Sequence, residues 1–491
     1  MVTPSDFPPR LPQELVDHII DNLADQWRFA EPDSQSRETL GQCMFVSRSF
    51  LTSVRRQLFH RIRLSEKCTA ALHLHDELAS TERMNAFLGV LKRDPLRATP
   101  HPLAAQVRGI KLEMHGVPAS RNHSPQSEKS TAKNIQEWND KRVHLYHILK
   151  ATSNLEAFAL EFILPMDAHS IHLGIFIAIE KVCHSTSITR LQFTNIYHFP
   201  VDLLATCTNL RELRLSAVSL AKPEALGSST GGDSKPASTI LRATWNKDSL
   251  RCLETLDTRL SGEVIVAIKE AASVTSSSPP FSQLKTLQLG LHIWSSPKSA
   301  EEWEVMNSAA RSLECLCIRG INGDSLAGTV TQQFYGNICL SKLTSLRALK
   351  LRTSVPGYSL FQYLSPDLLP LLSTKSRLPT TIETIHLDFY FRNVSNVDDL
   401  QHPETIPDRP GIDSVLAGSG LYPRLRTVKV RYLFRSQDYW RWSVTQPPEA
   451  MARLHVAVKR AFPQVSASDN IELEISSETF NENDNEYELQ W

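Results

Sequence analysis

The sequence predicts an α/β repeat protein, in which a small three-helix domain at the N-terminus precedes a curved solenoid with a parallel sheet. Three observations favour this class. A short motif, apolar-x-x-apolar-x-apolar, recurs along most of the 491 residues. Segments with the apolar spacing of a helix lie between several copies of this motif. The N-terminal region begins with one clear amphipathic helix and continues with two further apolar segments.

The first helix is predicted from Leu11 to Leu23. Pro12 suits the first position of a helix, where its missing N–H is not needed. Glu14 falls in the first turn, where the helix dipole favours a negative charge. Apolar residues recur at every fourth position and form one stripe, which comprises Leu11, Leu15, Ile19 and Leu23.

A second helix is expected over roughly Leu40 to Val46, and a third over Phe50 to Leu58. Three helices in about fifty residues bury little surface on their own. We therefore expect an apolar face of this domain to be left over for a partner.

These residues resemble an F-box. The family pattern is a Leu-Pro-x-Glu-Leu start, an Ile-Ile-x-x-Leu continuation, a Cys-x-x-Val-Ser/Cys-Arg/Lys-x-aromatic centre and a Leu-Phe end. The matching residues are Leu11, Pro12, Glu14, Leu15, Ile19, Ile20, Leu23, Cys43, Val46, Arg48, Phe50, Leu58 and Phe59. Phe50 stands where the family often has Trp, and the link from Ala24 to Thr39 is longer and more polar than usual.

The resemblance covers about residues 8 to 64 and implies binding to a Skp-type linker subunit, and through it to a cullin, of a ubiquitin ligase. The residues that it assigns to this docking are Leu11, Pro12, Glu14, Leu15, Ile19, Val46 and Phe50.

Beyond the first sixty residues, the recurring motif predicts the strands of the solenoid. Its copies are Val107-Ile110-Leu112, Leu155-Phe158-Leu160, Ile188-Leu191-Phe193, Leu210-Leu213-Leu215, the degenerate Leu253-Leu256, Leu284-Leu287-Leu289, Leu313-Leu316-Ile318, Leu346-Leu349-Leu351, Ile382-Ile385-Leu387, Leu425-Val428-Val430 and Ile471-Leu473-Ile475. Ser or Thr stands just before several copies. Helical patterns lie between them, at His169 to Cys183, Ala300 to Ala310 and Ser359 to Leu372.

This region resembles an irregular leucine-rich-repeat solenoid, and the whole chain resembles the large fungal F-box-like families. Several steps of roughly 29 to 36 residues suit a strand-plus-helix repeat. The x positions of the motif are then expected on a polar, slightly basic concave face. The candidate substrate residues on this face are Arg211, Arg214, Lys285, Gln288, Arg347, Lys350, Arg426 and Lys429.

The expected organisation has five parts. They are an N-terminal tail at 1–10, the F-box-like domain at 11–64, a helical connector at 65–106, the solenoid at 107–475 and an acidic tail at 476–491. Polar inserts are expected at 118–133, 222–239 and 393–411. Phe59-x-x-Ile62-x-Leu64 also matches the strand motif, so the helical domain is a candidate to continue directly into a first strand.

Composition argues against several classes of protein. Lys plus Arg and Asp plus Glu both number 53, so no general attraction to nucleic acid or to an anionic membrane is expected. The chain has no run of eighteen apolar residues. Eight scattered cysteines suggest reduced thiols of a cytosolic or nuclear protein.

No constellation for bond chemistry is found. Gly227 to Gly231 spells the G-x-S-x-G string of hydrolases, but it lies in a Ser/Gly/Pro-rich stretch without a strand before it. The histidine pairs 73/75 and 144/147 lack companion ligands, and Cys315-x-Cys317 lacks a second pair. We therefore expect no catalytic, cofactor-binding or metal-binding residues, and a protein that is not an enzyme.

The leading expectation from these resemblances is a substrate-recognition adaptor of a Skp/cullin/F-box ubiquitin ligase, with an unidentified target protein on the repeat region. The first alternative is an interaction scaffold without a ligase role, in which the N-terminal helices only cap the solenoid. Exposure of the stripe Leu11, Leu15 and Ile19 distinguishes the two, because a capping role would bury it. A hydrolase that uses Ser229 is the remaining alternative.

Overall fold

The protein is described from a computed structural model. Its chain divides into two compact units, 1–192 with 484–491, and 193–483. The residues that the structure describes are 12–25, 34–65, 76–93, 103–114, 135–136, 139–140, 142–220, 245–246, 248–259, 261–275, 281–290, 299–322, 338–356, 369, 371–373, 378–392, 411–418, 420–435 and 448–480.

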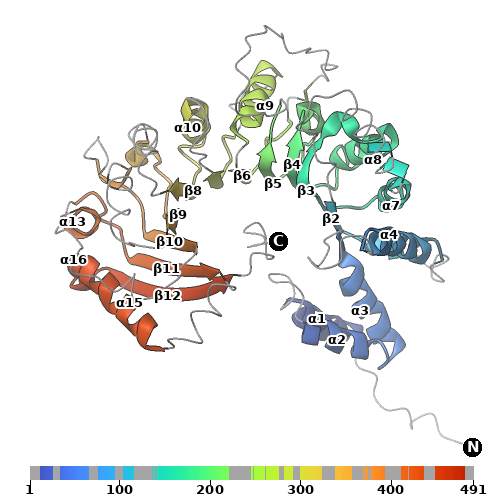
Figure 1. Cartoon of the computed structure of the whole chain (residues 1–491), viewed down its shortest axis with the longest axis horizontal. Coiled ribbons are helices and arrows are strands. Elements are labelled where there is room, and N and C mark those ends of the chain that lie inside the picture. The colour runs from blue at the N-terminus through green and yellow to red at the C-terminus, as the bar shows by residue number, and fades with distance from the viewer. Residues whose placement is uncertain are drawn as a thin grey trace, which may run out of the picture. The chain divides into compact units, whose positions relative to one another are not determined.

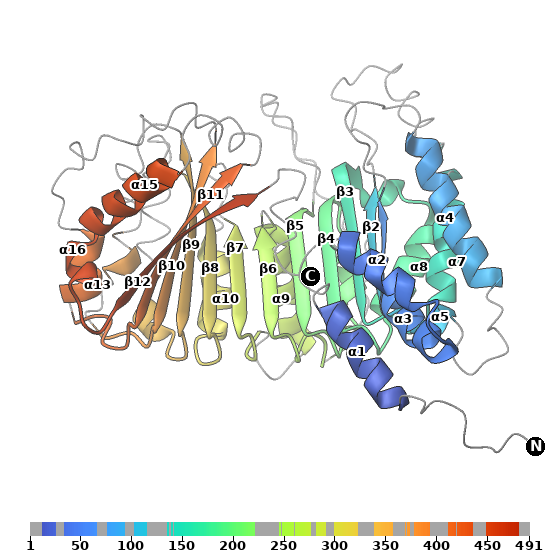
Figure 2. The ribbon, with the colours of Figure 1, turned by 90° about the horizontal axis from the view of Figure 1, so that it is seen from below.

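In this described part, twelve strands follow one another in sequence order within one sheet. The paired strands are parallel, and Figure 2 shows those of the second unit side by side. Their bounds are β1 Arg61–Ser65, β2 Gly109–Met114, β3 Ala157–Asp167, β4 Arg190–Tyr197, β5 Glu212–Val218, β6 Thr255–Arg259, β7 Thr286–Gly290, β8 Cys315–Asn322, β9 Ala348–Pro356, β10 Thr384–Arg392, β11 Thr427–Arg435 and β12 Glu472–Phe480.

Every predicted copy of the strand motif lies at a strand. Its three apolar residues are buried in the complete copies from Val107 to Val430. The copies in β1 and β12 are only half-buried, as expected for strands with a neighbour on one side only. The predicted α/β class with a parallel sheet is therefore confirmed.

Three helices precede the sheet: α1 Gln13–Asp25, α2 Ser34–Cys43 and α3 Arg48–His60. The expected position of the second helix was wrong, because α2 begins in the polar stretch read as a link, and Met44 to Val46 form a turn. The Ser47 side chain caps α3 by accepting a hydrogen bond from the Phe50 amide at 3.3 Å.

Helix α3 passes into β1 with no residue between them. Arg61, which follows the last helical residue, already has an extended backbone, with φ −129° and ψ 125°. Arg61 to Ser65 then pair in register with Gly109 to Glu113 of β2. The expected continuation of the helical domain into a first strand is present, and the predicted boundary at residue 64 falls inside β1.

The first unit also contains helices that connect its strands. These are α4 Asp76–Arg93, α5 Leu103–Gln106, α7 Val143–Ala151, the short 3-10 helix η2 Ala168–Ser170 and α8 Leu173–Cys183. Helices α4, α7 and α8 lie together on one side of the strands of this unit (Figure 1). The predicted helix from His169 to Cys183 corresponds to η2 and α8.

The second unit also contains helices between its strands. Its helices are η3 Val201–Leu204, α9 Gly262–Thr275, α10 Ser299–Ser308, η4 Leu340–Lys342, α13 Ile412–Gly418, α15 Pro448–Ala461 and α16 Pro463–Ser466. Helices α9, α10 and α13 lie on the outer side of an arc of strands (Figure 1). The strand face turned away from these helices is called the inner face below.

Ser and Thr side chains just before the strands donate hydrogen bonds to backbone carbonyls of the preceding repeat. The hydroxyls of Ser312 and Thr381 donate to the carbonyls of Leu284 and Leu346, at 2.9 and 2.8 Å. Ser345 donates in the same way to Arg311 at 2.6 Å. Because buried backbone carbonyls need partners, this bond explains why Ser or Thr precedes several copies of the motif.

Several predicted features lie outside the described residues. These are the tail at 1–10, most of the inserts, the predicted helix from Ser359 for most of its length, the G-x-S-x-G string with Ser229, and the histidines at 73 and 75. The predicted functions of these segments stay predictions.

Candidate functional site

The three N-terminal helices pack around a small apolar core. Ile20, Leu40 and Val54 are fully buried, one from each helix. Partly buried side chains that surround them are Cys43, Met44, Phe50 and Leu58. Phe50, predicted as a docking residue, therefore also packs against this core.

Large apolar side chains of α1 and of the turn between α2 and α3 lie at the surface. Leu15 is 50% exposed, Ile19 41% and Val46 65%, and Phe45 beside Val46 is 87% exposed. These four residues are called the apolar patch below. Pro12 and Glu14 are also exposed, while Leu11 lies outside the described residues. Helix α1 thus has two apolar rows, because Val16 and Ile20 are buried while Leu15 and Ile19 are not.

A polar network fixes α1 against α3 beside this core. Gln13 Nε2 donates to Asp17 Oδ1 at 2.9 Å and to Ser53 Oγ at 3.0 Å. The Ser53 hydroxyl also donates to Asp17, and Arg56 Nη1 lies 3.6 Å from Asp17 Oδ2. Burial raises the pKa of Asp17, but the bonds from Ser53 and Gln13 and the charge of Arg56 outweigh it and lower this pKa overall. The network holds the exposed face of α1 in a fixed orientation.

In the second unit, half of the predicted substrate residues share one row of the inner face. Strand register places one residue of each of β5 to β12 in this row. In order, they are Arg214, Asp257, Gln288, Cys317, Lys350, His386, Lys429 and Glu474. The four predicted residues in this row, Arg214, Gln288, Lys350 and Lys429, are thus brought together as expected.

The other four predicted residues lie in the turns just before the strands. There, acidic and basic residues alternate from repeat to repeat, and each residue's amide donates to the carbonyl of the preceding one. This alternating row is Arg211, Glu254, Lys285, Glu314, Arg347, Glu383 and Arg426. Glu254 contacts both of its neighbours, at 3.5 Å to Arg211 and 3.1 Å to Lys285.

This row carries mixed charge with a small basic excess. Four basic residues alternate with three glutamates, so most of the charges offset one another. Arg211, Lys285, Arg347 and Arg426 are exposed, and exposed ion pairs between such residues contribute less than about 1 kcal/mol each.

A basic row that sequence reasoning missed lies two residues further along the strands. Its members, in register from β5 to β12, are Ser216, Arg259, Gly290, Arg319, Arg352, Asp388, Arg431 and Ser476. The four arginines of this set are called the arginine row. They stand directly after the last position of the motif, which is Thr258 in the degenerate copy, so extending the motif by one residue would have found them.

Asp388 holds one end of the arginine row. Its carboxylate accepts hydrogen bonds from Arg352 Nε at 2.8 Å and from Arg431 Nε and Nη2 at 3.0 and 2.7 Å. Arg431 also contacts Glu478 at 3.0 Å. Burial raises the pKa of Asp388, but the bonds from Arg431 and the charge of Arg352 lower it overall.

The other end of the row has fewer carboxylates. Asp257 accepts from Arg259 Nε and Nη2 at 3.2 and 2.9 Å. Arg319 Nη2 donates to the neutral amide oxygen of Gln288 at 2.7 Å. Burial, followed by the charges of Arg259 and Arg352, lowers the pKa of Arg319. The positive charge of Arg319 is therefore less well compensated than that of Arg352.

His386 lies in the row next to the arginine row, on β10 between Lys350 of β9 and Lys429 of β11. Burial, followed by the charge of Lys350, lowers its pKa to about 4, and Asp388 only partly offsets this. His386 is consequently neutral near pH 7 and adds no charge to the face.

The strands of the first unit carry a buried cluster of mixed charge on their polar face. Glu113 of β2 and Glu161 of β3 are buried and lie opposite each other in register. Lys111 Nζ contacts both, at 2.9 and 3.3 Å, and Arg63 Nε contacts Glu113 at 2.9 Å. Burial raises the pKa of Glu113, but Lys111, Ser65 and Arg63 lower it to about 2.

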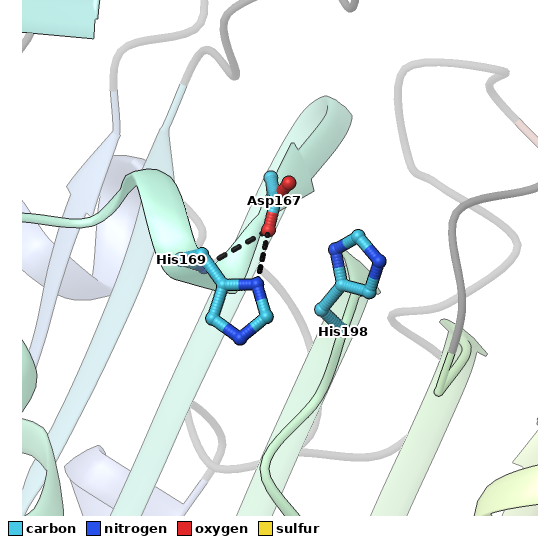
Figure 3. Close-up of side chains that lie close together, drawn as sticks. All are labelled: Asp167, His169 and His198. Atoms are coloured by element: carbon cyan, nitrogen blue, oxygen red, sulfur yellow. Dashed lines mark hydrogen bonds and ion pairs between the residues drawn. The ribbon is translucent and has the colours of Figure 1, made fainter. Parts of the chain in front are cut away.

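The candidate metal ligands from the sequence that the structure describes do not gather into a site. His144 and His147 lie on α7, and Cys315 and Cys317 lie on one face of β8, where residues two apart point the same way. Figure 3 shows Asp167, whose carboxylate accepts from the His169 amide at 2.9 Å and lies 3.5 Å from its imidazole Nδ1. His198, also drawn there, belongs to the second unit. The Asp167–His169 pair is explained by capping of η2.

Comparison with known proteins leaves the family open. No family model matches the chain, and no curated protein matches it. Among the described residues, no helix has the length and apolar character needed to cross a membrane.

Proposed function

We propose that this chain is a substrate-recognition adaptor of a Skp/cullin/F-box ubiquitin ligase. The N-terminal helices dock a Skp-type linker subunit, and the inner face of the second unit binds a target protein. The adaptor does no bond chemistry itself. It acts by proximity, because it raises the effective concentration of target lysines near the ubiquitin-loaded enzyme.

The observation that carries the proposal is the apolar patch. Leu15 and Ile19 of α1 are exposed, as are Phe45 and Val46 of the turn between α2 and α3, although the three helices bury Ile20, Leu40 and Val54 completely. Helices that only capped the solenoid would turn these apolar side chains inward. Large exposed apolar side chains on a small domain are typical of a protein interface. Leu15, Ile19 and Val46 are also among the residues that the F-box resemblance assigns to the linker subunit.

Co-purification of the full chain with a Skp-type linker subunit tests this proposal. Wild type is expected to retain the linker, and Leu15→Arg is expected to lose it, because a central apolar anchor contributes about 2 kcal/mol or more. Leu173→Arg is the matched control, since Leu173 of α8 is 70% exposed and lies in the same unit outside the patch. Circular dichroism checks that both variants are folded.

Failure of wild type to retain the linker would contradict the ligase proposal. The scaffold alternative would then stand, and it is favoured by one observation, the direct passage of α3 into β1. Equal loss in Leu15→Arg and Leu173→Arg would also count against a specific docking face.

A further inference from the structure

The arginine row leaves guanidinium groups on the inner face without full hydrogen bonding. Among the described residues, Arg319 Nε and Arg352 Nη1 are buried nitrogen atoms that have no hydrogen-bond partner. The two residues face each other in register on β8 and β9. Neighbouring strands lie about 4.8 Å apart, so one small ligand can reach both guanidinium groups.

The charges of the row do not balance. Arg259, Arg319, Arg352 and Arg431 face two buried carboxylates, Asp257 and Asp388. Glu478 contacts Arg431 at the outer end of the row, where its side chain is 49% exposed. Lys350 lies on the same face, two residues before Arg352. The centre of the row, around Arg319, therefore carries an excess of positive charge.

Gly290 is the one member of the basic row that has no side chain. It occupies the position between Arg259 and Arg319, and a Cβ there would lie 2.9 Å from Arg259 Cα and 3.3 Å from Arg259 Cγ. A side chain at this position would conflict with Arg259. Arg259 fills the space that a side chain of residue 290 would take, so no side chain of β7 at this position stands between Arg259 and Arg319.

We propose that the arginine row, centred on Arg319 and Arg352, binds a phosphate monoester. Guanidinium groups donate paired hydrogen bonds to phosphate oxygens. A phosphate monoester carries about −1.5 to −2 charge near pH 7, which suits the excess of positive charge around Arg319 better than the single charge of a carboxylate does. The phosphoryl group can belong to a phosphorylated side chain of a protein or to a small free compound. The proposal does not depend on docking of a linker subunit.

Calorimetric titration of the full chain with O-phosphoserine, with serine and with acetate tests the site. Wild type is expected to bind O-phosphoserine, and Arg319→Gln is expected to weaken it by about tenfold, because a charge-assisted hydrogen bond is lost. Arg319 donates to the Gln288 amide oxygen rather than to a carboxylate. Arg319→Gln therefore leaves no buried acid unpaired and is expected to fold. The double variant Arg319→Gln/Arg352→Gln is expected to abolish binding.

The matched controls are Arg251→Gln and Arg424→Gln. They remove the same charge from exposed residues in the turns before β6 and β11, and neither residue is among the candidate substrate residues. They are expected to leave affinity unchanged within about twofold, as exposed charges act only weakly at a distance. Equal weakening by control and row variants, or equal affinity of wild type for serine and O-phosphoserine, would overturn the proposal.

A second arm distinguishes the sources of the phosphoryl group. Phosphoserine peptides of varied sequence are titrated beside O-phosphoserine and pyrophosphate. Tighter binding of some peptide sequences supports a phosphorylated protein as the ligand, whereas tighter binding of pyrophosphate supports a small compound. Either result requires weaker binding by Arg319→Gln than by wild type, and undiminished binding by this variant counts against the site.

Discussion

Gly290 and Arg259 face each other on the parallel strands β7 and β6, with no space for a Cβ on the glycine. An added Cβ would lie 2.9 Å from the Arg259 Cα, which is a backbone atom and cannot move without its strand. The identity of residue 290 is thus fixed by its neighbour across the sheet.

Gly290→Ala is therefore expected to lower the free energy of unfolding by about 1–3 kcal/mol, the usual cost of overpacking. Gly89→Ala is the control, because no atom lies within 4 Å of its added Cβ in helix α4. That variant should instead gain about 0.5–1 kcal/mol from helix propensity. Calorimetry of both variants measures their free energies of unfolding. Equal changes in the two variants would contradict the close contact between residue 290 and Arg259.

The two apolar rows of helix α1 should respond differently to truncation. Ile20→Ala is expected to cost about 2–5 kcal/mol of stability, because Ile20 is fully buried between Leu40 and Val54. Leu15→Ala should change stability by less than about 0.5 kcal/mol, since Leu15 is half exposed. Urea unfolding measures both. A large loss in Leu15→Ala would show that the apolar patch is covered within the chain.

Asp388→Asn is expected to destabilise the second unit by about 3–5 kcal/mol. It removes the charge that pairs with Arg352 and Arg431 and leaves the buried Arg352 without a charged partner. Asp248→Asn provides the comparison, because Asp248 contacts Arg251 where both side chains are exposed, and should cost less than about 0.5 kcal/mol. Thermal unfolding at pH 7 distinguishes them, and similar melting temperatures would refute the buried pairing.

Stability should fall as pH falls from about 6.5 to about 4, in part because of His386. Its pKa in the folded protein is lowered from 6.5 to about 4. Between these values the unfolded chain binds the proton and the folded protein does not, so protonation favours unfolding. The loss should stay below about 1 kcal/mol because the ring is partly exposed. His386→Gln should flatten the unfolding free energy across this window.

Carboxylates affect the free energy of unfolding in a separate range of lower pH. The folded-state pKa of Glu113 is lowered from 4.5 to about 2, so the stability that this group contributes is present above pH 4.5 and is lost as pH falls toward 2. A decline between pH 6.5 and 5 that is unchanged in His386→Gln would contradict the role given to His386.

The strands could be predicted because their signal is local. Leu284, Leu287 and Leu289 alternate within six residues and point to one buried face, as do the corresponding residues of the other repeats. Helix α2 could not be placed, because Ser34 to Thr39 carry no apolar spacing and the helix depends on Leu40 packing in a tertiary core.

The inner face was only partly predictable for a different reason. The motif identifies which residues point away from the helices, but not which charges meet across strands. Arg319 and Arg352 are 33 residues apart in sequence, and only strand register places them side by side. Glu254 likewise offsets Lys285 through a contact 31 residues away, which a single repeat cannot reveal.

Because α3 passes directly into β1, the rotation of α3 about its own axis is fixed relative to the strand. Each residue of an α-helix turns the chain by about 100°, while each residue of a strand reverses the direction of the side chains. A single residue inserted between His60 and Arg61 would therefore turn α3 by about a quarter of a circle relative to β1. The direction in which Leu15 and Ile19 point is thus set by the length of the chain at this junction, where natural variants are expected to tolerate substitution far better than insertion or deletion.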